Sequence, residues 1–554
     1  MDFMRKILII NLLFSVIIAF SMMSCAPEDI PSSEDDGQIS ETPVTPEPEP
    51  EPDPDPVPDP DPVLPVFESS YEAIRSMGVG WNLGNTLDAV WWTGGTDGRD
   101  WEAWETGWGQ PVTRPELMTM MKNAGFGAIR VPVTWGVHMD TDGKVFDEWM
   151  SRVNQVVDYV LNAGMYCIIN IHHDTGSDES AWLVAHPDVY EKVRKRYEGL
   201  WTQIAERFKA YDQRLLFEAY NEMLDESRSW CYASMNIGYD YNAASDAYDA
   251  INSYAQSFVD AVRATGGNNA VRNLVVNTYG ACNGSGTWSQ YLQDPLKYMK
   301  MPADNVKDHI IFQVHSYPNI DDISAMETEV SEMFRLWDKY LVPLGGPVIV
   351  GEWGTFSENP PLENYCRYAD YFIRLAKEYE MGTFHWMSLS NGFYRSLPAF
   401  SHPEIAEVIV KAYHGEGFSP EIPVLEDIDL KYKVTYKKLW SEANLLPSEL
   451  YLSEYKGVAF ELEQAPKEGS LKVKAYGESD GKEQYTGFEG TSAKVYFNKS
   501  SLGSKVTRVT LQCMIDEEVE TVIKRVAIIK TDGTEEECMP SVFWGCEIEL
   551  IVED

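Results

Sequence analysis

Between residues 70 and about 415, eight short apolar runs alternate with longer amphipathic stretches. Apolar runs that lack polar alternation are typical of strands buried on both faces, as in parallel sheets covered by helices. The stretches between them, such as 149–162 and 245–265, repeat apolar residues with the helical period. Eight strand–helix units in a row predict an α/β fold, a closed (β/α)8 (TIM) barrel. The expected strands are 78–83, 128–134, 167–172, 215–220, 274–278, 310–314, 348–351 and 382–386.

A doubly wound open sheet is the alternative arrangement of such units. That fold carries a glycine-rich phosphate-binding turn after its first strand. The first apolar run here is not followed by a turn of that kind. The barrel is therefore the favoured architecture, and we assign residues 67–420 to it.

The pattern changes after residue 420. Short runs with polar–apolar alternation are separated by Gly, Asp and Ser turns, and no helical pattern follows them. Such spacing predicts an antiparallel all-β sandwich for residues 421–554. Its role stays open between a carbohydrate-binding domain and a rigid accessory domain. The aromatic residues in or near its turns include Trp440, Tyr485, Phe488, Phe543 and Trp544.

Polar side chains gather where the barrel strands are expected to end. Active sites of such barrels lie at the carboxyl ends of the strands. Polar groups that converge there are costly to bury unless they have partners, so a purely structural explanation is unfavourable. We therefore expect a functional site on this rim. The residues at or near the strand ends are Asn85, Arg130, His172, His173, Asn221, Glu222, His315, Tyr317, Glu352 and Trp386.

Two carboxylates stand out on this rim, Glu222 after the fourth strand and Glu352 at the end of the seventh. In a barrel these positions face each other, and a proton donor opposite a nucleophile is the arrangement that glycosidases need. Glu218 and Glu358 are the competing carboxylates. We expect Glu218 to be structural, because it falls on the other alternation of its strand.

The run of His172, His173 and Asp174 is also compatible with a metal site. Adjacent residues on a strand point to opposite sides, however, and no third ligand has the spacing that zinc sites use. We therefore predict no catalytic metal and no cofactor.

Six motifs in the barrel region carry a family resemblance. They are GWNLGNTLDA at 80–89, WGQPVT at 108–113, IRVPVTW at 129–135, IHHD at 171–174, FEAYNE at 217–222 and VGEWG at 350–354. Together they resemble glycoside hydrolase family 5 of clan A, and the first is most similar to its subfamily 4 endo-β-1,4-glucanases and xyloglucanases. The resemblance implies a retaining endo-acting hydrolase of cellulose-like, mixed-linkage or xyloglucan chains.

The same resemblance implies a role for each rim residue. Glu222 is expected to be the general acid/base and Glu352 the nucleophile. Asn221 is expected to hold the sugar 2-hydroxyl, and Arg130 to pair with Glu352. Asn85 is implied as a further substrate-binding residue. His172 and His173 are expected at the hydroxyls of the −1 sugar, His315 and Tyr317 on the two carboxylates, and Trp386 as the floor under that sugar.

Five tryptophans lie between residues 91 and 108, after the first strand. Such a loop either lines distal sugar subsites or packs against the barrel. Trp91 or Trp92 is the favoured sugar contact.

Composition limits the partners of the chain. Its formal net charge of −42 repels phosphate backbones, which argues against nucleic acid. A neutral polysaccharide is compatible with this charge, and we expect a monomer. The rival functions are a β-mannanase or xylanase of the same family, and a catalytically silent surface glycan-binding protein.

The N-terminal segment resembles a bacterial lipoprotein leader. Arg5 and Lys6 precede an apolar stretch, 7–20, that is too short to span a membrane. We expect residues 1–24 to be a signal peptide and Cys25 to carry the lipid, which places the protein on the outer membrane at the cell surface. The alternative is an ordinary signal peptide with an incidental cysteine. Residues 25–66 hold 13 of the 31 prolines and are expected to form an extended acidic tether.

Overall fold

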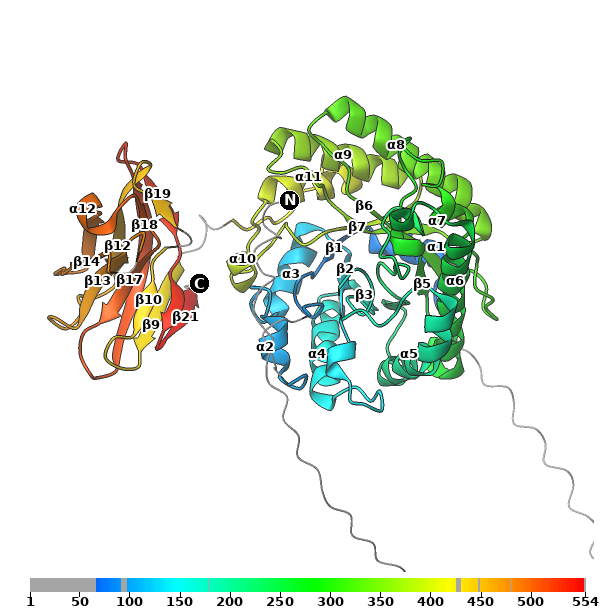
Figure 1. The fold of residues 1–554 in the computed structure, drawn as a ribbon, viewed down its shortest axis with the longest axis horizontal. Coiled ribbons are helices and arrows are strands. Elements are labelled where there is room, and N and C mark those ends of the chain that lie inside the picture. Colours follow the sequence, from blue (N-terminus) through cyan, green and yellow to red (C-terminus); the bar gives the residue numbers. More distant parts are fainter. Residues whose placement is uncertain are drawn as a thin grey trace, which may run out of the picture. The chain divides into compact units, whose positions relative to one another are not determined.

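The computed structural model describes residues 66–90, 97–178, 180–424, 430–446, 449–479 and 481–552. These residues form a barrel and a separate β domain, each described here by itself (Figure 1). The expected signal peptide, Cys25 and the tether up to residue 65 lie outside the described residues. Across the described ranges, no helix combines the length and apolar character that a membrane crossing requires.

The first part is a closed barrel of eight parallel strands in sequence order, with β8 pairing back onto β1. This confirms the predicted architecture, and every expected strand is present. The strands are β1 Val79–Asn82, β2 Ala128–Val131, β3 Tyr166–Asn170, β4 Leu215–Glu218, β5 Leu274–Asn277, β6 Ile310–Ser316, β7 Val348–Trp353 and β8 Gly382–His385.

Helices surround this barrel (Figure 1). Their ends follow local sequence signals: α3 starts with Pro115 in its first turn and stops at Gly125, whose φ is 108°. The Asp322 side chain accepts the Ser324 N–H and so caps α8. The helices are α1 Ser70–Met77, α2 Trp101–Glu105, α3 Pro115–Ala124, α4 Asp147–Asn162, α5 Pro187–Arg207, α6 Tyr241–Ala264, α7 Asp294–Lys297, α8 Ile323–Tyr340, α9 Leu362–Glu378, α10 Phe393–Ser396 and α11 Pro403–His414.

The barrel interior is layered, because every second residue of a strand faces inward. One layer is apolar and fully buried: Ala128, Ile168, Leu216, Val275, Ile311, Ile349 and Phe384. Two positions further along the same strands, the next layer is polar and equally buried: Arg130, Asn170, Glu218, Asn277 and Gln313. The apolar layer therefore closes the barrel beneath a polar layer at the carboxyl ends of the strands.

The second part is an all-β domain of antiparallel strands with its own buried core, as predicted. One sheet has the order β14-β13-β17-β10-β20 and the other β15-β12-β18-β9-β21; β11 pairs with β16, and β19 with β18. A single-turn helix, α12 Lys499–Leu502, is an addition that the sequence pattern did not predict. The strands are β9 Leu430–Tyr436, β10 Glu442–Asn444, β11 Leu450–Tyr451, β12 Tyr455–Leu462, β13 Leu471–Tyr476, β14 Glu483–Thr486, β15 Ser492–Tyr496, β16 Lys505–Val506, β17 Arg508–Cys513, β18 Val519–Lys530, β19 Glu535–Cys538, β20 Ser541–Trp544 and β21 Cys546–Val552.

Candidate active site

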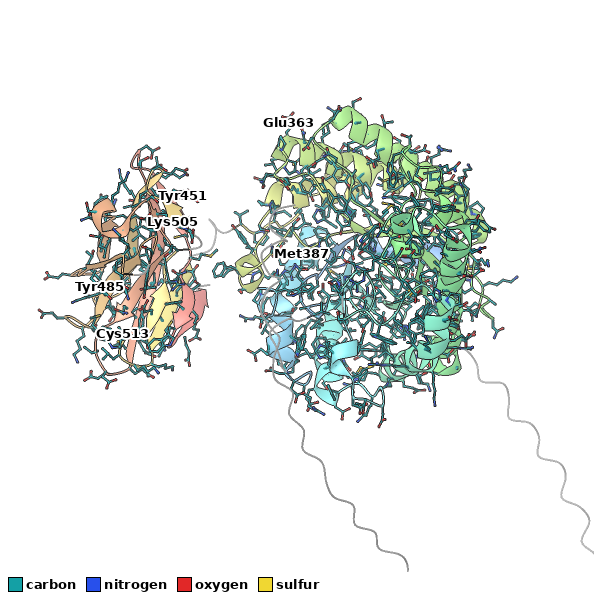
Figure 2. All side chains as sticks on the ribbon, viewed as in Figure 1. Glu363, Met387, Tyr451, Tyr485, Lys505 and Cys513 are labelled. Atoms are coloured by element: carbon teal, nitrogen blue, oxygen red, sulfur yellow. The ribbon has the colours of Figure 1, made fainter. Side chains whose placement is uncertain are left out.

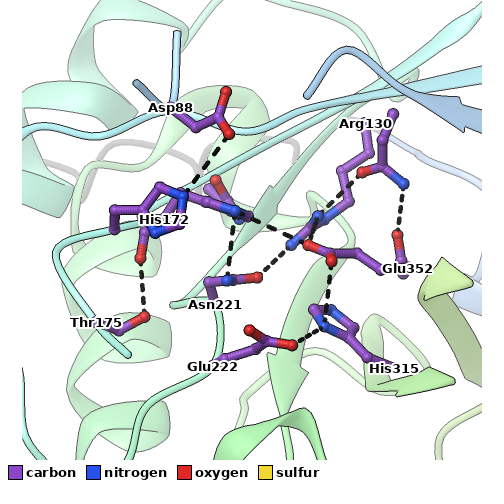
Figure 3. A network of polar contacts seen from close by, with 12 residues as sticks. Asp88, Arg130, His172, Thr175, Asn221, Glu222, His315 and Glu352 are labelled. Atoms are coloured by element: carbon purple, nitrogen blue, oxygen red, sulfur yellow. Dashed lines mark hydrogen bonds and ion pairs between the residues drawn. The ribbon is translucent and has the colours of Figure 1, made fainter. Parts of the chain in front are cut away.

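Arg130 is the centre of the polar layer and is fully buried. Its Nη1 donates to Glu352 Oε1 at 2.7 Å (Figure 3). Its Nε and Nη2 donate to the two oxygens of Glu218 at 2.7 and 2.8 Å. Nη2 also donates to Asn221 Oδ1 at 2.8 Å, and Nη1 to Asn82 Oδ1 at 3.0 Å. A buried guanidinium needs such complete pairing, so this network fixes the position of Glu352.

Glu218 lies on the inside of the barrel, and the alternation argument that placed it elsewhere is wrong. It accepts bonds from Arg130, and from the side-chain amides of Asn170 and Asn277 on neighbouring strands. Strand β4 ends at Glu218, so the strand period does not extend to Glu222. Its expected structural role fits these contacts, because both its oxygens are bound to Arg130. Glu358, the other competing carboxylate, is exposed.

Glu352 is nearly inaccessible, with 6% of its side chain exposed. Burial and the nearby Glu222 carboxylate raise its pKa, while His315, Arg130 and the Tyr317 hydroxyl oppose that rise. The Tyr317 hydroxyl donates to Glu352 Oε2 at 2.8 Å. One oxygen of Glu352 therefore binds a cation and the other a hydroxyl group.

Glu222 is the more accessible carboxylate, with 24% of its side chain exposed. His315 Nδ1 lies 2.7 Å from Glu222 Oε1 and 3.6 Å from Glu352 Oε2. An oxygen of Glu222, an oxygen of Glu352 and a ring nitrogen of His315 all lie within 4.8 Å of one another. The structure thus brings the two predicted carboxylates together and gives each a different set of partners.

Irregular pairing at the ends of β6 and β7 sets this geometry. The pairing of β6 with β7 shifts register between Val314 and His315 of β6. The pairing of β7 with β8 shifts register between Val350 and Trp353 of β7. Such irregularities occur beside active sites, where they change the direction of a side chain. A Cβ at Gly351 would overlap the buried amide of Gln313, so this close approach requires glycine.

The predicted sugar-contact residues His172 and Trp386 also lie at the cavity. Their rings are parallel, with centroids 5.9 Å apart. His172 is buried, and burial together with the nearby His173 and Arg130 lowers its pKa well below the usual value, so it is neutral. Trp386 packs so closely over Gly84 that a Cβ there would overlap its indole.

His173 differs from its neighbour in the direction of its pKa shift. Burial lowers its pKa, but the Asp178 carboxylate 3.2 Å away and Asp88 outweigh that effect, so its pKa is raised overall. It lines the cavity with His172. Two adjacent histidines therefore offer the cavity one neutral ring and one ring that favours the charged form.

Asn221 and Asn85 differ in their position relative to the carboxylates. The Asn221 side-chain amide lies 3.4 Å from His172 Nε2 and accepts from Arg130, which places it inside the network. Asn85 instead occupies a turn with φ of 57°, and its backbone N–H donates to Asp88. Asn85 is not among the residues that line the cavity.

The cavity at the carboxylates has a volume of about 670 Å³. Three exposed aromatic residues on its wall were not found from the sequence: Trp230, Trp288 and Phe356. They follow β4, β5 and β7, so their only sequence signal was an aromatic residue in a loop after a strand end. Trp91 and Trp92, the favoured contacts, lie outside the described residues, and Trp104 packs into the core.

Asp88, His172 and His173 offer donor atoms within 4.8 Å of one another, as a metal site does. Their atoms already have protein partners, however. The Asp88 oxygens accept the N–H groups of Asn85 and Thr86, and His172 Nδ1 lies 3.0 Å from the Asn170 amide. The trio is therefore explained by hydrogen bonding, and we assign no metal to it.

Comparison with known proteins agrees with this geometry. Endoglucanase A of Clostridium longisporum is 33% identical over 323 residues, which cover 56% of this chain and 57% of that protein. Endoglucanase A of Ruminococcus albus is 33% identical over 346 residues, covering 59% of this chain and 85% of that protein. This chain thus spans just over half the length of the first of these relatives.

Two solved structures match this chain over nearly their whole length. A GH5-4 broad specificity endoglucanase from an uncultured bacterium is 50% identical with a TM-score of 0.59, covering 63% of this chain and 97% of that one. A family 5 enzyme of Prevotella bryantii B14, in complex with the xyloglucan tetradecasaccharide XXXGXXXG, is 40% identical with a TM-score of 0.57, covering 63% and 99%. The family description Cellulase (glycosyl hydrolase family 5) matches residues 92–392, more than half of the chain. The chain therefore belongs to glycosyl hydrolase family 5.

Proposed function

We propose that the chain is an endo-acting β-1,4-glucanase that works by double displacement with retention of configuration. The observation that carries the proposal is the pair of carboxylates with different hydrogen-bond partners, whose oxygens approach within 4.8 Å of each other. Retaining glycosidases hold their two carboxyl groups about 5–5.5 Å apart, whereas inverting enzymes leave about 6.5–9.5 Å for a water molecule. The short separation favours direct attack by a carboxylate.

In the first step, Glu352 attacks the anomeric carbon while Glu222 gives its proton to the departing glycosidic oxygen. The bond from the anomeric carbon to that oxygen breaks, and an ester to Glu352 forms. Glu352 suits the nucleophile role because Arg130 and Tyr317 hold its oxygens. Glu222 suits the acid role because it is open to the cavity and has His315 as its close hydrogen-bond partner.

In the second step, water attacks the anomeric carbon from the side that the leaving group vacated. Glu222 takes the proton of the water, and the ester bond to Glu352 breaks. Two inversions give overall retention. Arg130 donates hydrogen bonds to both Asn221 and Glu352, so the Asn221 side chain is held near the nucleophile. This position suits a hydrogen bond between Asn221 and the sugar 2-hydroxyl in both transition states.

The aromatic wall of the cavity supports a polymeric substrate. Trp230, Trp288 and Phe356 add ring surfaces beyond the carboxylates, and rings can stack on pyranose faces without needing charge. The Prevotella bryantii relative was solved with a xyloglucan fragment, which supports a β-1,4-glucan backbone that tolerates branches.

Stereochemistry and rescue test the mechanism. We expect NMR of early products to show the β-anomer. The Glu352→Ala variant should lose turnover, and azide should then yield an α-glycosyl azide; with Glu222→Ala, azide should yield the β-azide. α-Anomeric products would overturn retention, and exchanged azide products would reverse the two roles.

A substrate panel tests the specificity. We expect cleavage of soluble cellulose derivatives, mixed-linkage glucan and xyloglucan, with a rapid fall in viscosity as in endo-cleavage. Faster turnover of glucomannan or of xylan than of any glucan would favour the mannanase or xylanase alternative. Binding to these polymers without turnover of any would favour the silent glycan-binding protein.

We further propose that the protein is lipid-anchored through Cys25 at the cell surface. The support is the leader pattern and the acidic, proline-rich segment behind it.

A further inference from the structure

The outer face of one sheet in the C-terminal domain carries a hollow of about 430 Å³, within the usual range of ligand sites. All five strands of the β14-β13-β17-β10-β20 sheet, or the turns beside them, contribute to it. We propose that this hollow is a second glycan-binding site that holds a neutral β-glucan chain. The ligand class rests on the proposed function of the barrel. The lining residues are Trp440, Glu442, Lys474, Tyr485, Gln512, Phe543 and Trp544.

Strand register places these residues on one face. Glu442 pairs with Gln512 on one side and with Trp544 on the other, while Lys474 pairs with Tyr485. The alternating positions, such as Val473 and Leu511, face the core. Tyr485 and Trp544 therefore lie on opposite edge strands, four strand spacings or roughly 19 Å apart, which suits several sugar units in a row.

The aromatic rings of the hollow remain accessible. Trp440, Tyr485, Phe543 and Trp544 are each between 39% and 50% exposed. Trp440 has a φ of 71°, a left-handed conformation that is an outlier for a bulky residue. Phe488, which the sequence grouped with them, instead packs against Phe460 with ring centroids 4.9 Å apart. Of the five aromatic residues that the sequence grouped, the four most exposed are thus those around the hollow.

A polar centre lies between the rings. Thr510 and Gln512 alternate with the core residues of β17 and so lie on the outer face of the sheet, yet both are buried. Glu442 accepts hydrogen bonds from Tyr476, Thr510 and Gln512. The Gln512 carbonyl oxygen, Oε1, has no hydrogen-bond partner among the described residues. A buried acceptor without a partner is costly, and a sugar hydroxyl can donate to it.

The charges at the hollow favour a neutral ligand. Lys474 Nζ lies 3.3 Å from Glu483 Oε1 and also lies over the Tyr485 ring. Glu442 is bound by three donors, as described above. Since both charged residues that line the hollow, Glu442 and Lys474, already have protein partners, neither offers an unpaired charge to an ionic ligand. Rings on both sides of a hydrogen-bonding centre match a chain of pyranose units.

Affinity electrophoresis of the full chain tests the site. All proteins carry Glu352→Ala so that the polymer in the gel is not digested, and the gels contain hydroxyethyl cellulose, xyloglucan or mixed-linkage glucan. We expect Trp544→Ala and Tyr485→Ala each to weaken retardation ~10-fold on at least one polymer. Tyr451→Ala is the matched control: Tyr451 is 57% exposed in the same domain, does not line the hollow, and is labelled apart from Tyr485 in Figure 2.

The same substitutions without Glu352→Ala separate this site from the barrel. Turnover of a soluble cello-oligosaccharide should be unchanged by Trp544→Ala and Tyr485→Ala, which also shows that the barrel is folded. Equal retardation of all variants on every polymer would overturn the site, as would an equal loss with Tyr451→Ala. If the protein turned over no substrate but was still retarded, and this retardation depended on Trp544 and Tyr485, the proposed function would be refuted but this site would not.

Discussion

Glu222 and Glu352 are the same amino acid in two environments, and the difference fits the different roles proposed for them. Glu352 is buried and bonded to Arg130 and Tyr317, whereas Glu222 is open to the cavity and bonded to His315. Enzymes assign acid and nucleophile roles to paired carboxylates by such differences in surroundings. The partners of Glu352, which act on the pKa of its carboxyl, should therefore influence the pH dependence of activity.

Removing the Tyr317 hydroxyl tests this control. Its hydrogen bond favours the ionised form of Glu352 and so lowers the pKa of that carboxyl. In Tyr317→Phe the pKa of Glu352 should rise, so the acidic limb of the kcat/KM–pH profile should move to higher pH. Loss of a hydrogen bond to a charged group, ~1.5–3 kcal/mol, should also lower kcat by about 10–100-fold. An acidic limb that stays in place or moves to lower pH would contradict this prediction.

The exposed tryptophans of the cavity wall should matter only for long substrates. Trp288→Ala removes a ring that is 63% exposed and lines the cavity. We expect kcat/KM on xyloglucan to fall about 10-fold, with little change on a short aryl glycoside that fills only the sites next to the carboxylates. Tyr241→Ala is the control, because Tyr241 is similarly exposed but lies outside the cavity lining. An equal loss on both substrates would argue against a distal subsite.

At the scale of elements, the sequence predicted most of the fold because the strand and helix periods are strong in the barrel. All eight expected strands are present. Seven of the ten rim residues line one cavity, and Arg130 and Asn221 join them through the hydrogen bonds of Arg130 to Glu352 and Asn221. Glu218 was misplaced for a physical reason. Side chains alternate between the two faces only within a strand, and β4 ends at Glu218, so the alternation cannot be carried on to Glu222. The shifts of register near His315 and Glu352 depend on contacts between strands, so a single-strand pattern could not predict them.

The close approach of β6 and β7 gives a prediction at this scale. In Gly351→Ala the new methyl group would push the buried Gln313 amide, whose Nε2 lies 3.3 Å from His315 Nε2. Overpacking of a buried site costs ~1–3 kcal/mol, so we expect a lower midpoint of urea unfolding. Because His315 contacts Glu222, kcat should fall as well.

Gly199→Ala is the matched control for this substitution. Gly199 lies within α5, and a Cβ there would meet nothing within 4 Å. Alanine is favoured over glycine in a helix by about 1 kcal/mol, so this variant should be as stable as the parent or more stable. If Gly351→Ala matched Gly199→Ala in both unfolding midpoint and kcat, the close packing would not position His315.

At the scale of the whole molecule, the chain combines a family 5 barrel, a β domain with a proposed glycan site, and an acidic N-terminal segment. A polysaccharide is too large to diffuse through a cell envelope, so an endo-acting enzyme must meet its substrate outside. An anchor followed by an extended tether would hold the enzyme there while leaving it free to reach a polymer. At ~3.1 Å per residue, residues 25–66 would reach roughly 130 Å.

The anchor is testable at Cys25. The apolar stretch 7–20 is shorter than the ~20 residues that a membrane-spanning helix needs, which fits a cleaved leader. Once the leader is removed, the lipid on Cys25 would attach the protein to the membrane. In the native host, Cys25→Ser should move the protein from the membrane fraction to the soluble fraction, with turnover of a soluble oligosaccharide unchanged. Cys366→Ser, which changes a partly buried thiol of α9, should leave the protein in the membrane fraction. Mass spectrometry of the wild-type protein should find an acylated N-terminal peptide that begins at residue 25. A wild-type protein without acylation, or a Cys25→Ser protein that remains with the membrane, would refute the anchor, because no other acylated residue is proposed.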